Sequence, residues 1–273
     1  MSGISQGGII HLTHLDLALA SVLILLLAAV SWLMHLDTGK QLIIAAVRTA
    51  LQLTLIGLVL KSLFENAELV WVALIGVFML LVAGREVMAR QHQRMIGGWS
   101  YAVGTGSMFV STFCITILIL TTVIGVDPWY TPQYAIPLLG MMLGNTMNGI
   151  ALGLDRLLQG VVQQRAIIET RLMLGQSGYQ ALTELRHDSI RIGMIPMINA
   201  MAAAGLVSLP GMMTGQILSG TAPVEAVKYQ ILIMFMITAG TGFGTLAAVW
   251  LAGRRLFDDR ERLRLDRLQS RKK

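Results

Sequence analysis

Hydrophobic residues gather in long runs along this chain, and short polar stretches separate the runs. A run of about 20 apolar residues is long enough for a helix to cross the hydrocarbon core of a bilayer. Runs of roughly this length lie at 15–35, 41–62, 67–84, 99–125, 134–154, 192–218 and 224–252. The pattern therefore predicts an all-α, polytopic membrane helix bundle with about seven transmembrane helices.

Composition supports a membrane protein and argues against a nucleic-acid partner. Of the 273 residues, 55% are hydrophobic and 13% are charged, whereas soluble domains carry about twice that charged fraction. A formal net charge of +6 is compatible with nucleic-acid binding, but nearly all of the basic residues lie in the predicted loops, at the span ends and in the C-terminal segment. This distribution is typical of membrane topology, so we expect a lipid bilayer and no nucleic acid around the chain.

The basic residues divide unequally between the two sides of the membrane that seven spans define. One side receives 18 of them, whereas the other receives only Lys61 and Lys228. The excess of Lys and Arg marks the cytoplasmic side of membrane proteins. We therefore expect the N-terminus outside and the C-terminus in the cytoplasm. Residues 1–257 are expected to form a single transmembrane domain, and residues 258–273 a basic cytoplasmic tail.

The one long loop, residues 155–191, falls on the cytoplasmic side. Apolar residues at helical spacing precede a Gly-Gln-Ser-Gly break at 175–178, and others resume that spacing after it. They are Ile168, Leu172 and Leu174 before the break, and Ala181, Leu182, Leu185 and Ile190 after it. The pattern predicts two short amphipathic helices around a turn. These helices either rest on the membrane surface or form a docking element for a cytoplasmic partner.

Polar residues inside the predicted spans are candidates for a path through the bundle, because burying them in lipid is costly. In the second span, Gln41, Arg48 and Gln52 share one helical face, which we expect to point into the bundle. Arg48 is either a structural residue that orients helices or part of the lining of the path.

The fifth span combines small residues with two asparagines. Pairs of small residues four apart let helix backbones approach closely in lipid. The pairs are Gly140 with Gly144 and Gly149 with Gly153. Asn145 and Asn148 lie about one turn apart, and Met141 shares a face with Asn145. The asparagines form either hydrogen bonds between helices or contacts with a transported solute.

The sixth span contains a sequence that should interrupt a helix. Pro210 followed by Gly211 is expected to break it and to leave backbone carbonyls unpaired. Discontinuous helices often build transport sites, so this break is a candidate gate.

The complete set of path or gate candidates is Arg48, Gln52, Met141, Asn145, Asn148, Asn199, Pro210, Met212, Met213 and Gln216. Thioethers suit soft metals, but methionine more often fills packing gaps, so the metal ligands stay unassigned.

The sequence carries no motif that would supply energy for transport. It has no phosphate-binding loop of the form GxxxxGK[S/T], so we expect no ATP hydrolysis and no bound cofactor in this chain. The spans also lack the pairs of mid-membrane acids that are typical of proton-driven carriers. A transporter of this kind needs either a partner that hydrolyses ATP or a downhill gradient.

The stretch from Glu169 to Ala181 resembles the coupling-helix motif of ABC transporter permeases, in which a short helix seats in a groove on the ATPase. The residues that the resemblance assigns to coupling are Glu169, Leu172, Gly175, Tyr179 and Ala181.

From about residue 40 to 257 the chain also resembles the Fet-type iron-export ABC permease family, which is similar to plant half-transporters linked to aluminium tolerance. The segments SLPGMM and KYQI are the most specific parts of this resemblance.

The resemblance implies a non-catalytic permease subunit in the cell inner (plasma) membrane. It implies export of iron or a related metal ion, driven by a separate ATP-binding subunit that binds ATP and magnesium. A homodimer of the permease is the expected assembly, because closed symmetric pairs are the commonest oligomers. The alternative is a stand-alone secondary metal carrier or channel that works without an ATPase.

Overall fold

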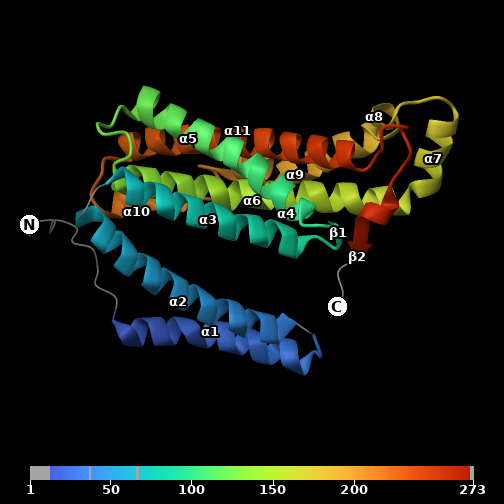
Figure 1. Ribbon diagram of the computed structural model, residues 1–273. Helices are drawn as coiled ribbons and strands as arrows, with labels where there is room; N and C mark the ends of the chain where they lie inside the picture. Colours follow the sequence, from blue (N-terminus) through green and yellow to red (C-terminus); the bar gives the residue numbers. More distant parts are fainter. Residues whose placement is uncertain (1–12, 37, 66–67, 271–273) are drawn as a thin grey trace, which may run out of the picture. The chain divides into compact units, whose positions relative to one another are not determined.

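The computed structural model describes residues 13–36, 38–65 and 68–270, and nearly all of their regular structure is α-helical (Figure 1). Among these residues, six helical segments are long and apolar enough to cross a membrane. They are Leu15–Leu33, Thr38–Lys61, Leu69–Arg90, Trp99–Ile124, Pro132–Gln163 and Pro223–Arg255. The chain is therefore an all-α polytopic membrane protein, with six candidate spans among the residues that the structure describes.

The predicted sixth span, 192–218, is interrupted, as Pro210 and Gly211 led us to expect, and it is not among the six candidate spans. α9 (Thr183–Ala203) ends within it, and α10 (Gly211–Leu218) begins directly after Pro210. The Ala203 carbonyl accepts three N–H groups from the loop that follows, which closes the end of α9. The first half of α9 is also charged, so the helix lacks the apolar length of the six spans. The expected break is present, but α9 already ends at Ala203, several residues before Pro210.

The chain divides into two compact units, which comprise residues 1–67 with 215–221 and residues 68–214 with 222–273. The described part of unit 1 contains a helical hairpin. Its helices are α1 (His14–Leu33) and α2 (Thr38–Glu65). Ser31 and Thr38 join the two helices, because their hydroxyl oxygens lie 2.7 Å apart. This bond fixes the end of α1 against the start of α2.

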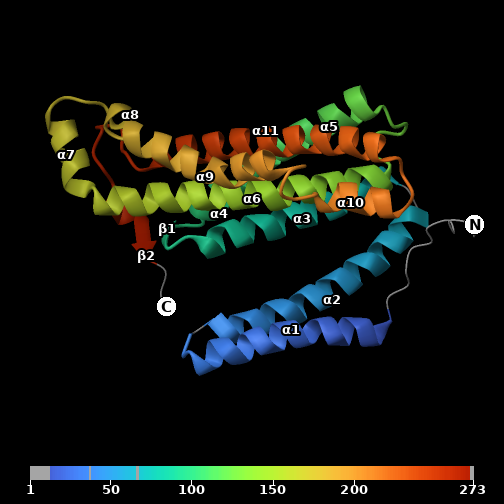
Figure 2. The same ribbon diagram turned by 180° about the vertical axis from the view of Figure 1, so that it is seen from behind.

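Unit 2 is built around α6, which packs along α3, α9 and α11 (Figures 1 and 2). Its helices are α3 (Leu69–Arg90), α4 (Trp99–Met108), α5 (Cys114–Ile119), α6 (Pro132–Gln163), α7 (Arg165–Met173), α8 (Gly178–Ala181), α9 and α11 (Pro223–Arg255). Two π-helical turns, η1 (Phe109–Phe113) and η2 (Leu120–Ile124), extend α4 and α5 into one continuous segment. The remaining elements are β1 (Gln93–Met95), a 3₁₀ turn (Leu265–Arg267) and β2 (Leu268–Ser270). α10 lies across the boundary between the units.

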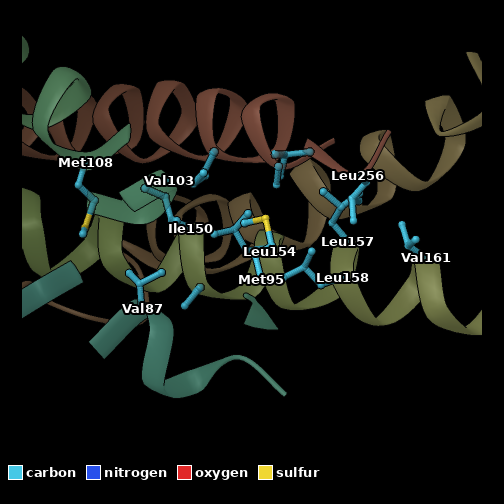
Figure 3. Packing of buried hydrophobic residues seen from close by; sticks show 14 of the residues in the cluster. Val87, Met95, Val103, Met108, Ile150, Leu154, Leu157, Leu158, Val161 and Leu256 are labelled. Atoms are coloured by element: carbon cyan, nitrogen blue, oxygen red, sulfur yellow. The ribbon is translucent and has the colours of Figure 1, made fainter. Parts of the chain in front are cut away.

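The hydrophobic core of unit 2 is centred on the second half of α6 (Figure 3). Leu154, Leu157 and Leu158 are fully buried there, together with Val87 of α3 and Leu256 just beyond α11. The helix therefore continues past residue 154, where the predicted fifth span ends. The apolar face continues for more than two further turns, and these turns anchor the elements that follow.

Glycines permit a close crossing of α6, α9 and α11. A Cβ added to Gly193 would lie 2.7 Å from the Gly149 carbonyl oxygen, and one added to Gly153 would lie 2.9 Å from Cγ2 of Thr245. Nothing lies within 4 Å of a Cβ added to Gly144. The second predicted pair of small residues therefore lies at a helix crossing, whereas Gly144 of the first pair does not.

The C-terminal segment folds back onto one end of unit 2. β2 pairs with β1 in an antiparallel ladder, and Arg267 donates from Nη1 to the carbonyl of Arg255 at 2.7 Å. The tail predicted at 258–273 is thus partly ordered on the unit's own surface. Residues 1–12 and 271–273 lie outside the described residues.

Candidate functional site

The predicted pair of short helices after α6 is present as α7 and α8, joined by a tight turn. Gly175 adopts φ of +86°, a conformation that glycine takes with little strain. Its N–H donates to the Leu172 carbonyl at 3.0 Å, which ends α7. Ser177 then caps α8 in a reciprocal capping box with Gln180. The Gly-Gln-Ser-Gly sequence therefore forms the turn because it supplies both a helix stop and a helix start.

One arginine ties this hairpin to the helix that follows it. Arg171 donates from Nη2 to the Glu184 carboxylate at 2.7 Å and from Nη1 to the Ala181 carbonyl at 3.3 Å. On α7 itself, Arg165 pairs with Glu169 at 2.8 Å, four residues apart. We infer from these contacts that α7, α8 and the start of α9 move together.

The hairpin has an apolar apex and an anchored inner face. Met173 and Leu174, at the apex, are each 79% exposed. Ile168 and Ala181 are buried, and Leu172 packs against the core of unit 2. Large apolar side chains left uncovered at the end of an anchored element are typical of a contact site for another protein or for a membrane surface.

The five residues assigned to coupling all lie in this hairpin. Leu172 and Ala181 face inward, Gly175 forms the turn, and Tyr179 is largely exposed. Glu169 is half-buried in its ion pair with Arg165. The structure thus gathers these residues into one element, at the end of unit 2 that also carries β1 and β2 (Figure 2). Their role in coupling stays a prediction.

The C-terminal segment holds the start of α8, a contact that the sequence did not indicate. The Glu261 carboxylate accepts a hydrogen bond from the Gly178 N–H at 2.6 Å. Hydrogen bonds from the Arg262 backbone and side chain lower the pKa of Asp258 to about 2, so that carboxylate stays charged and holds the turn before Glu261 in place. The Phe257 ring lies against Gly178, where an added Cβ would be 2.7 Å from it.

A row of polar residues on α6 faces the end of α3 and the strand that follows. Arg90 donates from Nη1 to the Asn148 side-chain oxygen. About two turns further along, the Asp155 carboxylate accepts the backbone N–H of His92 at 2.7 Å and the Gln159 amide at 2.8 Å. Asn148 therefore forms a hydrogen bond between helices, which was one of the two interpretations of the asparagines. Sequence reasoning missed Arg90 and His92 as partners, because they lie about 60 residues away along the chain.

The other path candidates are dispersed. Asn145 donates to the Met141 carbonyl of its own helix at 2.8 Å. Arg48 and Gln52 are exposed on α2, and Asn199 is exposed on α9. Half-buried candidates on or next to α10 are Pro210, Met212, Met213 and Gln216. Among the described residues, Asn199 forms no hydrogen bond with the α6 asparagines, and the lining of a path by these residues stays a prediction.

Acidic, histidine and cysteine side chains do not gather into a metal site within residues 13–36, 38–65 and 68–270. No group of three or more of them could hold a metal ion there.

The chain matches a protein family over most of its length. The family described as "Uncharacterised protein family (UPF0014)" matches residues 14–257. UPF0014 membrane protein slr1647 of Synechocystis sp. is 38% identical over 241 residues, which cover 87% of this chain and 90% of that protein. No solved structure matches the chain.

Two further relatives have names that describe a role. The Escherichia coli protein named "Probable iron export permease protein FetB" is 31% identical over 263 residues, covering 95% of this chain and 98% of FetB. "Protein ALUMINUM SENSITIVE 3" of Arabidopsis thaliana is 31% identical over 234 residues, covering 86% of this chain and 84% of that protein.

Proposed function

Because this chain belongs to the UPF0014 family of membrane proteins, we propose that it is the permease subunit of an ABC transporter that exports iron or a related metal ion. The name of the FetB relative supports iron export by a permease. The chain itself is a non-catalytic membrane subunit. ATP and magnesium bind to a separate ATP-binding subunit, which supplies the energy.

The observation that carries this proposal is the α7–α8 hairpin. Its apex, Met173 and Leu174, is exposed while its inner face is bound to the core of unit 2. α6 has 32 residues and extends about 48 Å at 1.5 Å per residue, whereas the hydrocarbon core is about 30 Å thick. The end of α6 therefore projects beyond the bilayer core, where a soluble subunit reaches the hairpin. This geometry favours docking over a hairpin that rests on the membrane surface.

The course of the chain supports seven crossings, one of them discontinuous. α6 and α11 end on the same side of unit 2, since Leu157 and Leu158 of α6 share a core cluster with Leu256. The chain between them must therefore cross back once. We assign that crossing to α9 and α10 together. With the basic residues on the hairpin side, the N-terminus lies outside and the C-terminus in the cytoplasm of a plasma (inner) membrane.

The break between α9 and α10 is our candidate gate. Backbone that is not helical is tolerated at membrane depth only where protein or a water-filled cavity surrounds it. Met212 and Met213 follow the break directly, and Gln216 lies one turn later. In this mechanism, closure of the ATPase pushes the hairpin, α9 moves with it, and the discontinuous crossing opens a path for the ion. A second copy of the chain completes the transporter as a homodimer.

Binding of an ATP-binding subunit to the purified chain tests the docking step. We expect the purified chain, in detergent, to retain an ATP-binding subunit encoded by its own genome. The Met173→Ser/Leu174→Ser double variant should weaken this retention about tenfold or more. The reason is that each large apolar side chain contributes about 1.5–3 kcal/mol when it is fully buried. Ile96→Ser is the matched control, since Ile96 is also exposed but lies outside the hairpin. Equal retention by the wild-type chain and the double variant would place docking elsewhere.

A further inference from the structure

A cavity of about 570 Å³ lies between α8, the start of α9, the end of α11 and the segment that follows α11. Its volume is in the range of pockets that hold small ligands or headgroups. Six residues with charged or aromatic side chains in its lining carry the argument below. They are Tyr179, Arg186, Trp250, Arg254, Asp259 and Glu261.

Arg186 is a buried cation without an anion. It is only 7% exposed, and its Nε has no hydrogen-bond partner. Its guanidinium lies 3.4 Å from the centre of the Tyr179 ring and donates one long bond, 3.4 Å, to Thr183. No carboxylate of the described residues is within ion-pair distance of it. A buried charge without a counter-ion is costly, so this cavity favours an anionic ligand.

A second guanidinium lines the same cavity. Arg254 lies over Trp250, with its Cζ 4.4 Å from the ring centre. Within the described part of the chain it also lacks a carboxylate partner. Two guanidinium groups beside one cavity suit a phosphate, whose oxygens accept paired hydrogen bonds from arginine.

The position of the cavity along α11 indicates where the phosphate comes from. Tyr229 and Trp250 are 21 residues apart within α11, which corresponds to roughly 32 Å at 1.5 Å per residue and so to the thickness of the hydrocarbon core. Trp250 therefore lies at the membrane interface, where tryptophan is enriched. Arg254, one turn further, lies at the level of the lipid headgroups, where basic pockets between helices bind them.

Acidic residues in the lining of the cavity narrow the choice of headgroup. Asp259 and Glu261 line it, whereas the Asp258 charge is already paired with Arg262 at 2.7 Å. Cations and anions in one cavity match a zwitterion. We propose that this cavity binds the amine-bearing headgroup of a phospholipid such as phosphatidylethanolamine. The phosphate lies between Arg186 and Arg254, and the ammonium faces Asp259 and Glu261. The bound lipid then links α8 to the end of α11.

Native mass spectrometry of the full-length, delipidated chain tests this proposal. The chain is titrated in detergent with phosphatidylethanolamine, phosphatidylglycerol or inorganic phosphate. We expect phosphatidylethanolamine to bind most tightly, and Arg254→Gln to weaken its binding about tenfold, the effect of losing about 1.4 kcal/mol. Arg260→Gln is the control, because Arg260 is an exposed neighbour that does not line the cavity.

At position 186 the test compares a variant that keeps the positive charge with one that removes it. Arg186→Lys should fold and retain measurable binding, whereas Arg186→Gln should lose most of it at an unchanged melting temperature. Equal lipid binding by the wild-type chain and Arg254→Gln would overturn the proposal. So would binding of inorganic phosphate without lipid, or equal affinity for phosphatidylglycerol. Weaker binding of an ATP-binding subunit by Arg254→Gln, with lipid binding unchanged, would assign the cavity to a protein contact instead.

Discussion

The Glu261 carboxylate accepts a hydrogen bond from the Gly178 N–H at 2.6 Å, and so joins the C-terminal segment to the first residue of α8. The two residues are 83 positions apart in the chain. A carboxylate at the first N–H groups of a helix satisfies donors that have no partner within the helix. The C-terminal segment is therefore part of the element that we propose to contact the ATPase.

Removing this carboxylate should loosen α8. We expect Glu261→Ala to speed hydrogen exchange of the α8 amides about fivefold to tenfold, because a charged acceptor at a backbone N–H contributes roughly 1 kcal/mol or more. Hydrogen–deuterium exchange of peptides that cover residues 176–184 measures the effect. Glu225→Gln is the control, since Glu225 is an acid that pairs with Lys228 at the opposite end of α11. Unchanged exchange in Glu261→Ala would mean that the capping contact does not hold the helix.

Asp258 should hold the turn of the C-terminal segment at all physiological pH values. Its pKa is lowered from 3.8 to about 2 by hydrogen bonds from Arg262. Because the folded pKa is below the unfolded one, the stabilisation is complete above about pH 4 and is lost as the pH falls through about 2. Infrared titration of the aspartate carboxylates should show one group protonating near pH 2, and Asp258→Asn should remove that signal.

The same substitution has a consequence at neutral pH. Asp258→Asn removes the acceptor of the Arg262 guanidinium, so trypsin should cleave the segment between residues 260 and 264 several-fold faster. Glu225→Gln is a suitable control, because it breaks an ion pair with Lys228 at the opposite end of α11. A cleavage rate equal to that of the wild-type chain would contradict the anchoring role of Asp258.

Two glycines of α6 should respond oppositely to alanine. A Cβ at Gly149 would meet the Thr241 side chain and lie 3.0 Å from the Gly193 carbonyl oxygen, so Gly149→Ala should destabilise the crossing by about 1–3 kcal/mol. Gly144→Ala meets nothing within 4 Å and should be neutral or stabilise the helix by up to about 1 kcal/mol. Thermal unfolding in detergent compares them. Equal melting temperatures would show that α6 does not cross α9 and α11 closely.

Local signals in the sequence predicted much of the fold. Hydrophobic run length identified six of the spans, and Gly175 with Ser177 defined the turn between α7 and α8. These features depend on neighbouring residues only, so a single sequence reveals them. The predicted sixth span is not among the six candidates, because its apolar run continues across the break whereas the helix stops at Ala203.

Contacts between distant segments could not be predicted in the same way. The pairing of β2 with β1 involves three-residue strands in a strongly charged segment, which carry no periodic signal. In the sequence, Arg186 cannot be distinguished from the other basic residues of the loop. Its burial beneath the Tyr179 ring, which makes it unusual, is visible only in the structure. Likewise, Asn148 gave no indication that Arg90 was its partner. The sequence supplied the types of side chain, and the packing of unit 2 supplied their partners.

Metal efflux in proteoliposomes tests the central claim most directly. The purified chain is reconstituted with an ATP-binding subunit of its own genome, and movement of Fe²⁺ is followed with and without ATP and magnesium. We predict ATP-dependent transport by the wild-type pair, at least tenfold slower transport with Met173→Ser/Leu174→Ser, and none by the chain alone. Fe²⁺ flux down a gradient through the chain alone, unaffected by ATP or by the hairpin variant, would contradict the account and identify a stand-alone carrier.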